Sequence, residues 1–218
     1  MNHLNMDFSQ RVVIHTAQQI WQSSPAPGVW RKPLEREARE SGHTTSVVRY
    51  DPGCTFRPHP HPLGEEILVL KGVFSDEHGD YPAGSYLRNP PGSQHAPFSQ
   101  EGCVILVKLN QFSQDDLSEV RIATNNVPWQ TNSEGIQERS LHEFSDEHVR
   151  LLKLNAGEQC CPANGGGEEI LVLSGTLNDE FGAYPSGCWI RNPQGNAHHL
   201  FVKQETVIWC KTGHLAPR

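Results

Sequence analysis

The chain has 218 residues, which is enough for one large domain or two small ones with cores of their own. Its 18 basic and 25 acidic residues give a net charge of −7, which disfavours binding to nucleic acid or to anionic membranes. Apolar runs such as Ile67–Leu70 are too short for a membrane-spanning helix, and with no secretory signal at the start and no framework spacing among the six cysteines we expect a cytoplasmic protein.

Short strands follow one another along the chain, separated by the 19 glycines and 16 prolines. The expected strands are Ser46–Tyr50, Ile67–Leu70, Ser85–Leu87, Val104–Leu109 and Leu151–Leu154. No segment carries a long apolar repeat of 3.6 residues, so helices are not expected. Strands of this length between frequent turns predict an all-β sandwich or barrel.

The sequence repeats itself with an offset of 103 residues. The matching segments are Glu65–Gly72 with Glu168–Gly175, and Gly79–Gly92 with Gly182–Gly195. A repeat of about 105 residues corresponds to a whole domain rather than a solenoid unit. We therefore expect two similar domains, residues 1–114 and 115–218. Arg88 and Arg191 recur in matched Arg-Asn-Pro turns, for which we expect a structural role.

The first copy contains a group of residues suited to binding a metal. His59 and His61 are two residues apart on an expected strand, so both side chains lie on the same face, about 6.7 Å apart at the backbone. Two imidazoles in this arrangement can share one ion at about 2.1 Å each. Glu65 follows a Pro-Leu-Gly turn that can bring it back beside them, with Glu66 as the competing acidic residue. His95 comes 30 residues later, so only the fold can deliver it.

These residues resemble the two motifs of the cupin family. The matching patterns are Gly53-x5-His59-x-His61-x3-Glu65-x6-Gly72 and Gly84-x5-Pro90-x-Gly92-x2-His95-x3-Ser99. The resemblance implies a jelly-roll β-barrel with three histidines and one glutamate around a single metal ion. It assigns those ligands to His59, His61, Glu65 and His95, and it favours Glu65 over Glu66.

A narrower resemblance is to the cupin-like domain of the anti-sigma factor ChrR. It is carried by Gly28–Arg36, Val73–Pro82 and His95–Phe98 and, more weakly, by the second copy, which implies a bicupin, a chain of two tandem cupin domains. In that family a separate helical domain with a His-x3-Cys-x2-Cys zinc motif binds the sigma factor. The motif does not occur in this sequence, so we do not expect sigma-factor binding. Another regulatory protein or a second copy of the chain, forming a homodimer, remains a candidate partner.

The second copy lacks half of the metal pattern. Glu168 and His198 occupy the positions of the acidic ligand and the third histidine, but the preceding loop, Cys160–Gly167, contains no His-x-His. We expect a degenerate domain without metal. Two alternatives remain open, a metal held by these two residues with the thiolate of Cys160 or Cys161, and a redox switch formed by the adjacent cysteines.

Three nitrogens and one oxygen suit zinc, iron(II), manganese and nickel alike. We expect one divalent ion per chain and favour zinc. No residue can be assigned a catalytic acid or base role from the sequence. The ChrR resemblance implies a regulatory or sensing module in oxidative-stress transcription control. The alternative is a mononuclear metal-dependent enzyme, a dioxygenase or isomerase acting on a small organic substrate, because an open coordination position permits such chemistry. The intact first site argues against a purely structural bicupin.

Overall fold

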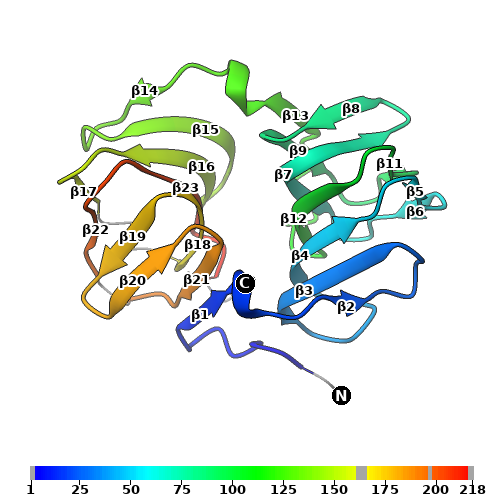
Figure 1. Cartoon of the computed structure of the whole chain (residues 1–218), viewed down its shortest axis with the longest axis horizontal. Helices are drawn as coiled ribbons and strands as arrows, with labels where there is room; N and C mark the ends of the chain where they lie inside the picture. The colour runs from blue at the N-terminus through cyan, green and yellow to red at the C-terminus, as the bar shows by residue number, and fades with distance from the viewer. Residues whose placement is uncertain (1–2, 161–165, 196–197, 216–218) are drawn as a thin grey trace. The chain divides into compact units, whose positions relative to one another are not determined.

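The computed structural model describes residues 3–160, 166–195 and 198–215 and consists almost entirely of β-structure (Figure 1). Helical structure in the described part of the chain is confined to two short 3-10 turns, Thr16–Gln18 (η1) and Thr124–Asn126 (η2). No helix among these residues is long and apolar enough to cross a membrane. The predicted all-β class is confirmed, and the chain divides into two compact units.

The first unit comprises Met1–Met6 and Gln19–Asn126. Its strands are β2 (Gln22–Ser23), β3 (Val29–Arg36), β4 (Thr44–Tyr50), β5 (Cys54–Thr55), β6 (His59–Pro60), β7 (Glu65–Asp76), β8 (Gly79–Pro82), β9 (Ser85–Asn89), β10 (Gln94–His95), β11 (Phe98–Ser99), β12 (Cys103–Leu109) and β13 (Val120–Ala123). The main sheet has the antiparallel order β13-β9-β7-β12-β4-β3-β2, while β10 pairs with β6 separately.

Strand β7 is long enough for its two halves to pair with different strands of the barrel. Its first half pairs with β9 and β12, and its second half pairs with β8 and β11. The change occurs at Gly72, which has a φ of 72°. A Cβ at this position would lie 2.1 Å from the carbonyl oxygen of Gly102, so only glycine fits. The bend lets one strand close the jelly roll around its core.

The core of the first unit is built from every second residue along its strands, the residues whose side chains face inward. Ile67 and Val69 on β7 face inward together with Ile105 and Val107 on β12, and all four are buried. Their spacing of two residues is the period at which side chains on a strand return to the same face. Burial of each such side chain contributes about 1.5–3 kcal/mol to stability.

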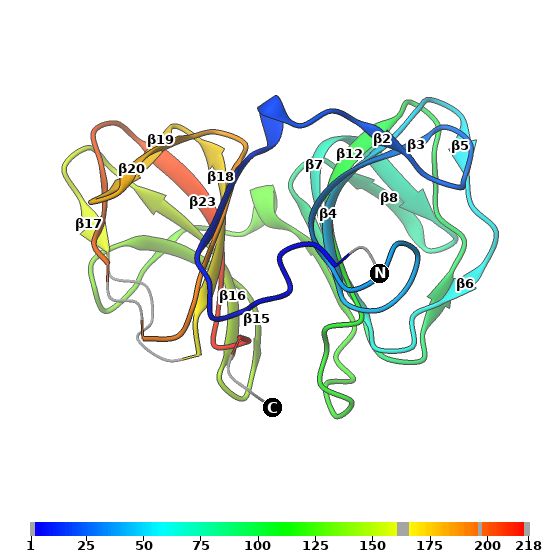
Figure 2. The same cartoon turned by 90° about the horizontal axis from the view of Figure 1, so that it is seen from below.

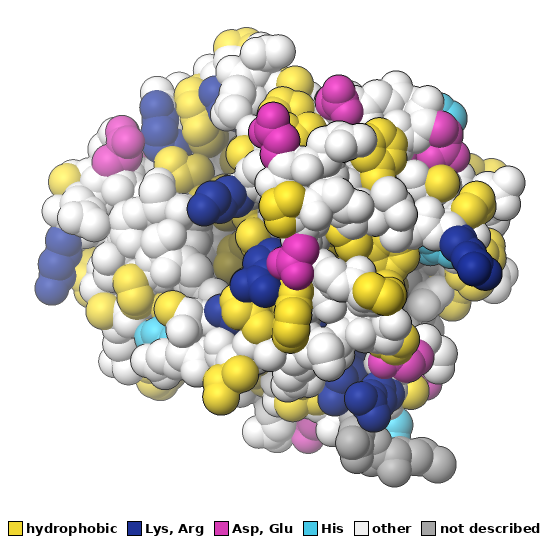
Figure 3. Space-filling view, turned by 45° about the vertical axis from the view of Figure 1, so that its right-hand side comes forward, with side chains coloured by type: hydrophobic (Ala, Val, Ile, Leu, Met, Phe, Trp, Pro, Cys, Tyr) yellow, Lys and Arg dark blue, Asp and Glu magenta, His cyan; other side chains and the backbone are white. Residues whose placement is uncertain are grey.

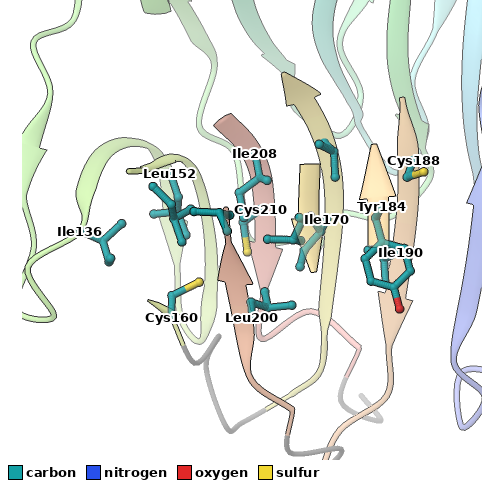
Figure 4. Packing of buried hydrophobic residues seen from close by; sticks show 14 residues of the cluster. Ile136, Leu152, Cys160, Ile170, Tyr184, Cys188, Ile190, Leu200, Ile208 and Cys210 are labelled. Atoms are coloured by element: carbon teal, nitrogen blue, oxygen red, sulfur yellow. The ribbon is translucent and has the colours of Figure 1, made fainter. Parts of the chain in front are cut away.

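The second unit comprises Asp7–Gln18 and Val127–Arg218. Its strands are β1 (Val12–His15), β14 (Gln130–Thr131), β15 (Gln137–Phe144), β16 (Glu147–Leu154), β17 (Gln159–Cys160), β18 (Glu168–Ser174), β19 (Thr176–Asp179), β20 (Gly182–Pro185), β21 (Cys188–Asn192), β22 (Leu200–Val202) and β23 (Thr206–Thr212). They form sheets of order β1-β21-β18-β23-β16-β15-β14 and β17-β22-β19-β20. Figure 4 shows Ile170, Ile190, Ile208 and Leu200 gathered in its core. This order matches that of the first unit, so the expected pair of similar barrels is confirmed.

The two barrels exchange one strand each. Strand β1, near the start of the first sequence copy, pairs with β21, with Val12 opposite Arg191. Strand β13, at the equivalent place in the second copy, pairs with β9, with Val120 opposite Arg88. In Figure 1 the blue β1 accordingly lies beside the orange β21, and Figure 2 shows the same chain from below. The predicted division into residues 1–114 and 115–218 therefore needs correcting, because residues 7–18 and 115–126 each complete the barrel of the other copy.

The recurring arginines hold the exchanged segments in place. Arg88 is fully buried and forms ion pairs with Glu66 at 3.2 Å and with Asp116 at 2.5 Å. Arg191 is equally buried, and its guanidinium donates a hydrogen bond of 2.9 Å to the carbonyl oxygen of Asp7. Each arginine lies near the end of its strand, β9 or β21, rather than in a turn, and ties that strand to the segment that precedes the exchanged strand, which is a structural role as expected.

The charged side chains do not segregate by sign on the visible surface. On the face drawn in Figure 3, basic and acidic side chains occur in small groups of both signs among hydrophobic ones. This pattern agrees with the modest net charge of the sequence.

Candidate metal centre

The four residues singled out in the first copy come together at one end of the first barrel. His59 lies in the two-residue strand β6, His61 follows it, Glu65 begins β7, and His95 ends β10. The pairing of β6 with β10 places His95 directly opposite His59. One donor atom from each of the four side chains lies within 4.8 Å of the others. The expected strand through His59 and His61 is shorter than predicted, but both side chains face this centre.

The donor atoms at this centre fit a divalent ion. Oε2 of Glu65 lies 3.3 Å from Nε2 of His61 and 3.2 Å from Nε2 of His95. Both Nε2 atoms are buried and neither makes a hydrogen bond. Buried polar atoms in proteins are nearly always satisfied. Two unsatisfied ring nitrogens converging on a carboxylate are what a site for a metal with nitrogen and oxygen ligands requires.

The protonation of Glu65 supports the same conclusion. Burial alone would raise the pKa of this carboxyl, but the contacts with His95 and His61 lower it to about 2. Burial lowers the pKa of His61, against the opposing charge of Glu65. The site therefore offers a permanently charged carboxylate and a neutral imidazole, both in the state that binds metal.

Hydrogen bonds outside the cluster fix the tautomers of the histidines. The Ser93 hydroxyl donates to the Pro90 carbonyl at 2.6 Å, so its oxygen accepts the Nδ1 proton of His61 at 3.1 Å. Oδ2 of Asp76 accepts the Nδ1 proton of His95 at 3.3 Å, and the Arg57 carbonyl accepts that of His59 at 3.2 Å. With each Nδ1 held as a donor, Nε2 is the ring nitrogen that faces the centre and that a metal ion would bind, in place of the proton on Nε2 in the case of His95.

A further residue, Arg121 on the exchanged strand β13, braces this outer layer. Asn89 donates a hydrogen bond of 2.8 Å to Oε2 of Glu65, and Arg121 donates one of 2.6 Å to the side-chain oxygen of Asn89. Arg121 also donates to the Tyr81 hydroxyl, which in turn donates to Asp76. The sequence analysis missed this residue because it lies beyond the expected boundary at residue 114, where no motif spacing points back to the first barrel.

We expect the Arg121→Ala variant to bind metal about 10- to 100-fold more weakly than the wild type, because loss of outer hydrogen-bond partners typically has that effect. Without the guanidinium, Asn89 and Tyr81 lose the contact that orients them toward Glu65 and Asp76. Competition titration against a chromophoric chelator measures the change.

The second barrel supplies a matched control in Arg11. Its guanidinium contacts Asn192 at 2.8 Å, Asp179 at 2.6 Å and Tyr184 at 2.8 Å, the equivalents of the residues around Arg121. The Arg11→Ala variant is expected to keep wild-type metal affinity. Equal affinities for the Arg121 and Arg11 variants would show that the outer layer around Glu65 is unimportant.

The competing acidic residue, Glu66, points away from the histidines. Its carboxylate accepts a hydrogen bond of 3.1 Å from Tyr86 and pairs with Arg88 at 3.2 Å. Adjacent residues on a strand face opposite sides. Glu65 is therefore the residue that the fold delivers to the cluster.

The equivalent residues of the second barrel, Glu168 and His198, contact each other directly. Oε1 of Glu168 lies 2.7 Å from Nε2 of His198 and accepts a hydrogen bond of 2.6 Å from Asn192. No group of three or more metal-binding side chains containing either Glu168 or His198 occurs in the described parts of the chain. Cys160 is buried, and Cys161 lies outside the described residues. That the second domain holds no metal stays a prediction.

A cavity of about 1040 Å³ opens onto the cluster of the first barrel. His59, His61 and Glu65 line one part of it. Val48 and Ile105 belong to an apolar part of the lining that continues into the barrel core. The cluster is therefore accessible to a small molecule while most of its atoms remain shielded from bulk water.

Metal binding is expected to weaken as the pH falls. In the metal-free site, burial alone would lower the pKa of His95, but its contacts with Asp76 and Glu65 raise it to about 9. A metal ion must replace the proton on Nε2, so affinity should fall about tenfold per pH unit below this value. Chelator competition at several pH values between about 6.5 and 8.5 tests this, and an affinity that is constant over that range would contradict it.

Comparisons with known proteins agree with this fold. A family model described as the ChrR cupin-like domain matches residues 9–113 and again residues 117–216. No curated protein matches the sequence significantly. Solved cupin-fold structures match nearly the whole chain, which shows that the two barrels have the cupin fold.

Three of these structures illustrate the likeness. A candidate dioxygenase from Nostoc punctiforme has a TM-score of 0.76 at 16% identity, over 96% of this chain and 85% of its own. The pirin YhhW from Escherichia coli, solved with nickel(II), has a TM-score of 0.71 at 12% identity, over 93% and 98%. A variant of the oxalate decarboxylase OxdC from Bacillus subtilis has a TM-score of 0.64 at 11% identity, over 94% and 78%.

Proposed function

Because the chain belongs to the family of ChrR cupin-like domains, of which it carries two copies, we propose that it is a regulatory or sensing module built around one divalent metal in its first barrel. The observation that carries this proposal is the convergence of His59, His61, Glu65 and His95, with two buried ring nitrogens lacking any hydrogen-bond partner. The second barrel, with its pair of Glu168 and His198, would then serve as a structural companion.

In the first barrel, four residues would bind the ion and two others would orient them. His59, His61, Glu65 and His95 would be its ligands, and zinc is the ion we favour among those that suit this donor set. When bound, the ion supplies a Lewis-acidic centre beside the cavity. Ser93 and Asp76 keep His61 and His95 in the binding tautomer.

The position of the ligands suggests how metal occupancy could become a signal. The four ligands come from β6 and the residues just after it, from the beginning of β7 and from β10, so a bound ion would cross-link the paired strands β6 and β10 to β7. Loss of the ion, or oxidation of a ligand, would loosen this end of the barrel and change the surface presented to a partner. We propose that a cytoplasmic regulatory protein, or a second copy of the chain, reads this change as part of an oxidative-stress response.

Hydrogen exchange on the full chain tests the proposal, because it resolves the two barrels separately. An ion that binds only the folded state stabilises it by about 2.7 kcal/mol at a hundredfold excess over Kd. Chelation should therefore speed exchange in β6, in the first half of β7 and in β10, and leave β18 and β21 unchanged. Unchanged exchange in the first barrel after verified metal removal would exclude a metal-controlled conformational signal.

A mononuclear metal enzyme is the second candidate function, and the cavity of about 1040 Å³ beside the cluster is the observation that favours it. A sensing ion needs no cavity of this size, whereas an enzyme needs space for a substrate next to its metal. Oxygen uptake and product formation over a panel of small organic substrates would detect such activity. The His95→Ala variant serves as the inactive control.

A further inference from the structure

The cavity beside the metal cluster contains a second chemical feature, the guanidinium of Arg36. This residue ends β3 and lines the cavity, and its side chain is only partly exposed. Its Nε is buried without a hydrogen-bond partner. A buried guanidinium nitrogen left unsatisfied is costly unless a ligand completes its hydrogen bonds.

The other charged side chains around this part of the cavity already have partners. Arg31 pairs with Glu40 at 2.9 Å. Glu37 accepts a hydrogen bond from the backbone nitrogen of His43 at 3.2 Å, and the ring of His43 pairs with the buried Glu35 at 2.7 Å. No described carboxylate is within ion-pair distance of the Arg36 guanidinium. Arg36 therefore presents an unneutralised positive charge to the cavity.

The register of the sheet places this charge at the same level of the barrel as the metal cluster. Arg36 lies opposite Thr44, Thr44 opposite Leu109, and Leu109 opposite Glu65. Three strand spacings separate Arg36 from Glu65, or about 14 Å along the sheet at the backbone. Both side chains line the same cavity, so the distance between the guanidinium and the carboxylate is shorter than the backbone distance. A molecule that contacts both must therefore be small.

The wall between the two ends decides the character of that molecule. Val48, Ile105, Val107 and Leu109 line the cavity along β4 and β12. An apolar wall favours a hydrocarbon segment, while a free guanidinium favours a carboxylate, which it can bind through two parallel hydrogen bonds.

We propose that the cavity binds a small organic acid, with a carboxylate on Arg36, its carbon chain against the aliphatic wall and its other end toward the metal cluster. This inference rests on the proposed metal site. It makes Arg36 the residue that selects for an anionic ligand. The same site could receive a signalling metabolite in a sensor or a substrate in an enzyme, because the recognition chemistry is common to both.

Isothermal titration of the metal-loaded full chain with malonate, succinate, glutarate and benzoate tests the proposal. We expect at least one of these acids to bind, and the Arg36→Gln variant to bind it about 10- to 100-fold more weakly, the effect of losing a hydrogen-bonded charge. Arg39→Gln is the matched control, because Arg39 also borders the cavity but its side chain is 78% exposed. That variant should retain wild-type affinity.

The outcomes separate this inference from the proposed metal function. Absence of binding by all four acids, or equal weakening by the Arg36 and Arg39 variants, overturns the carboxylate site whatever the metal content. Metal content is measured on the same samples. If the chain takes up no metal even with excess metal present, yet still binds an acid more tightly than the Arg36→Gln variant does, the proposed metal function fails and the carboxylate contact with Arg36 stands.

Discussion

The His95→Ala variant is expected to purify without stoichiometric metal, whereas the wild-type chain is expected to carry one equivalent. Removing this imidazole takes away one of four ligands and leaves Asp76 without the proton that its carboxylate accepts. Three remaining ligands of this type rarely keep full affinity. Elemental analysis of protein purified in the presence of excess zinc gives the number of metal ions per chain.

The fold provides a matched control in the second barrel. His198 occupies the position of His95 and contacts Glu168 as His95 contacts Glu65. The His198→Ala variant should therefore still carry one equivalent. Two equivalents in the wild type that fall to one in the His198 variant would instead indicate a second site near Glu168 and would revive the proposal of a cysteine ligand there.

The sequence was informative wherever the chemistry depends on short spacings. The turn between His61 and Glu65 spans three residues, so the spacing predicts that an acidic side chain returns to the histidines, while the choice of Glu65 over Glu66 came from the resemblance to the cupin motif. The internal repeat predicted two barrels of the same topology. The position of His95 beside the other three ligands could be expected only from the resemblance to the cupin family, because it depends on the pairing of β10 with β6.

The exchange of strands could not be read from the sequence, for a physical reason. Val12 and Val120 occupy equivalent positions and pair with the equivalent residues Arg191 and Arg88. A repeat makes the two pairings alike in their local contacts, so the pattern does not show which copy receives which strand. The contacts of Arg121 could not be predicted for the same reason, because this residue belongs to the second sequence copy and reaches the first barrel only through the exchanged strand β13.

A fragment of residues 1–114 is expected to be unstable and to lack metal, whereas a fragment of residues 19–126 should fold and bind one equivalent. The fragment of residues 1–114 lacks β13, so β9 loses its neighbour at the edge of the sheet. It also lacks Asp116, leaving the buried guanidinium of Arg88 with one ion pair fewer. Breaking a buried ion pair typically costs about 3–5 kcal/mol, a large part of the stability of a domain of this size.

Thermal unfolding followed by circular dichroism, together with metal analysis of both fragments, measures this difference. The Asp116→Asn variant of the 19–126 fragment separates the two contributions, because it keeps β13 and removes only the charge opposite Arg88. It should have an intermediate melting temperature and still bind metal through the Asn89 and Arg121 contacts. If the 1–114 fragment were as stable as the 19–126 fragment and bound metal equally well, then β13 would not be part of the first barrel, and each copy would have to complete its barrel with its own first strand.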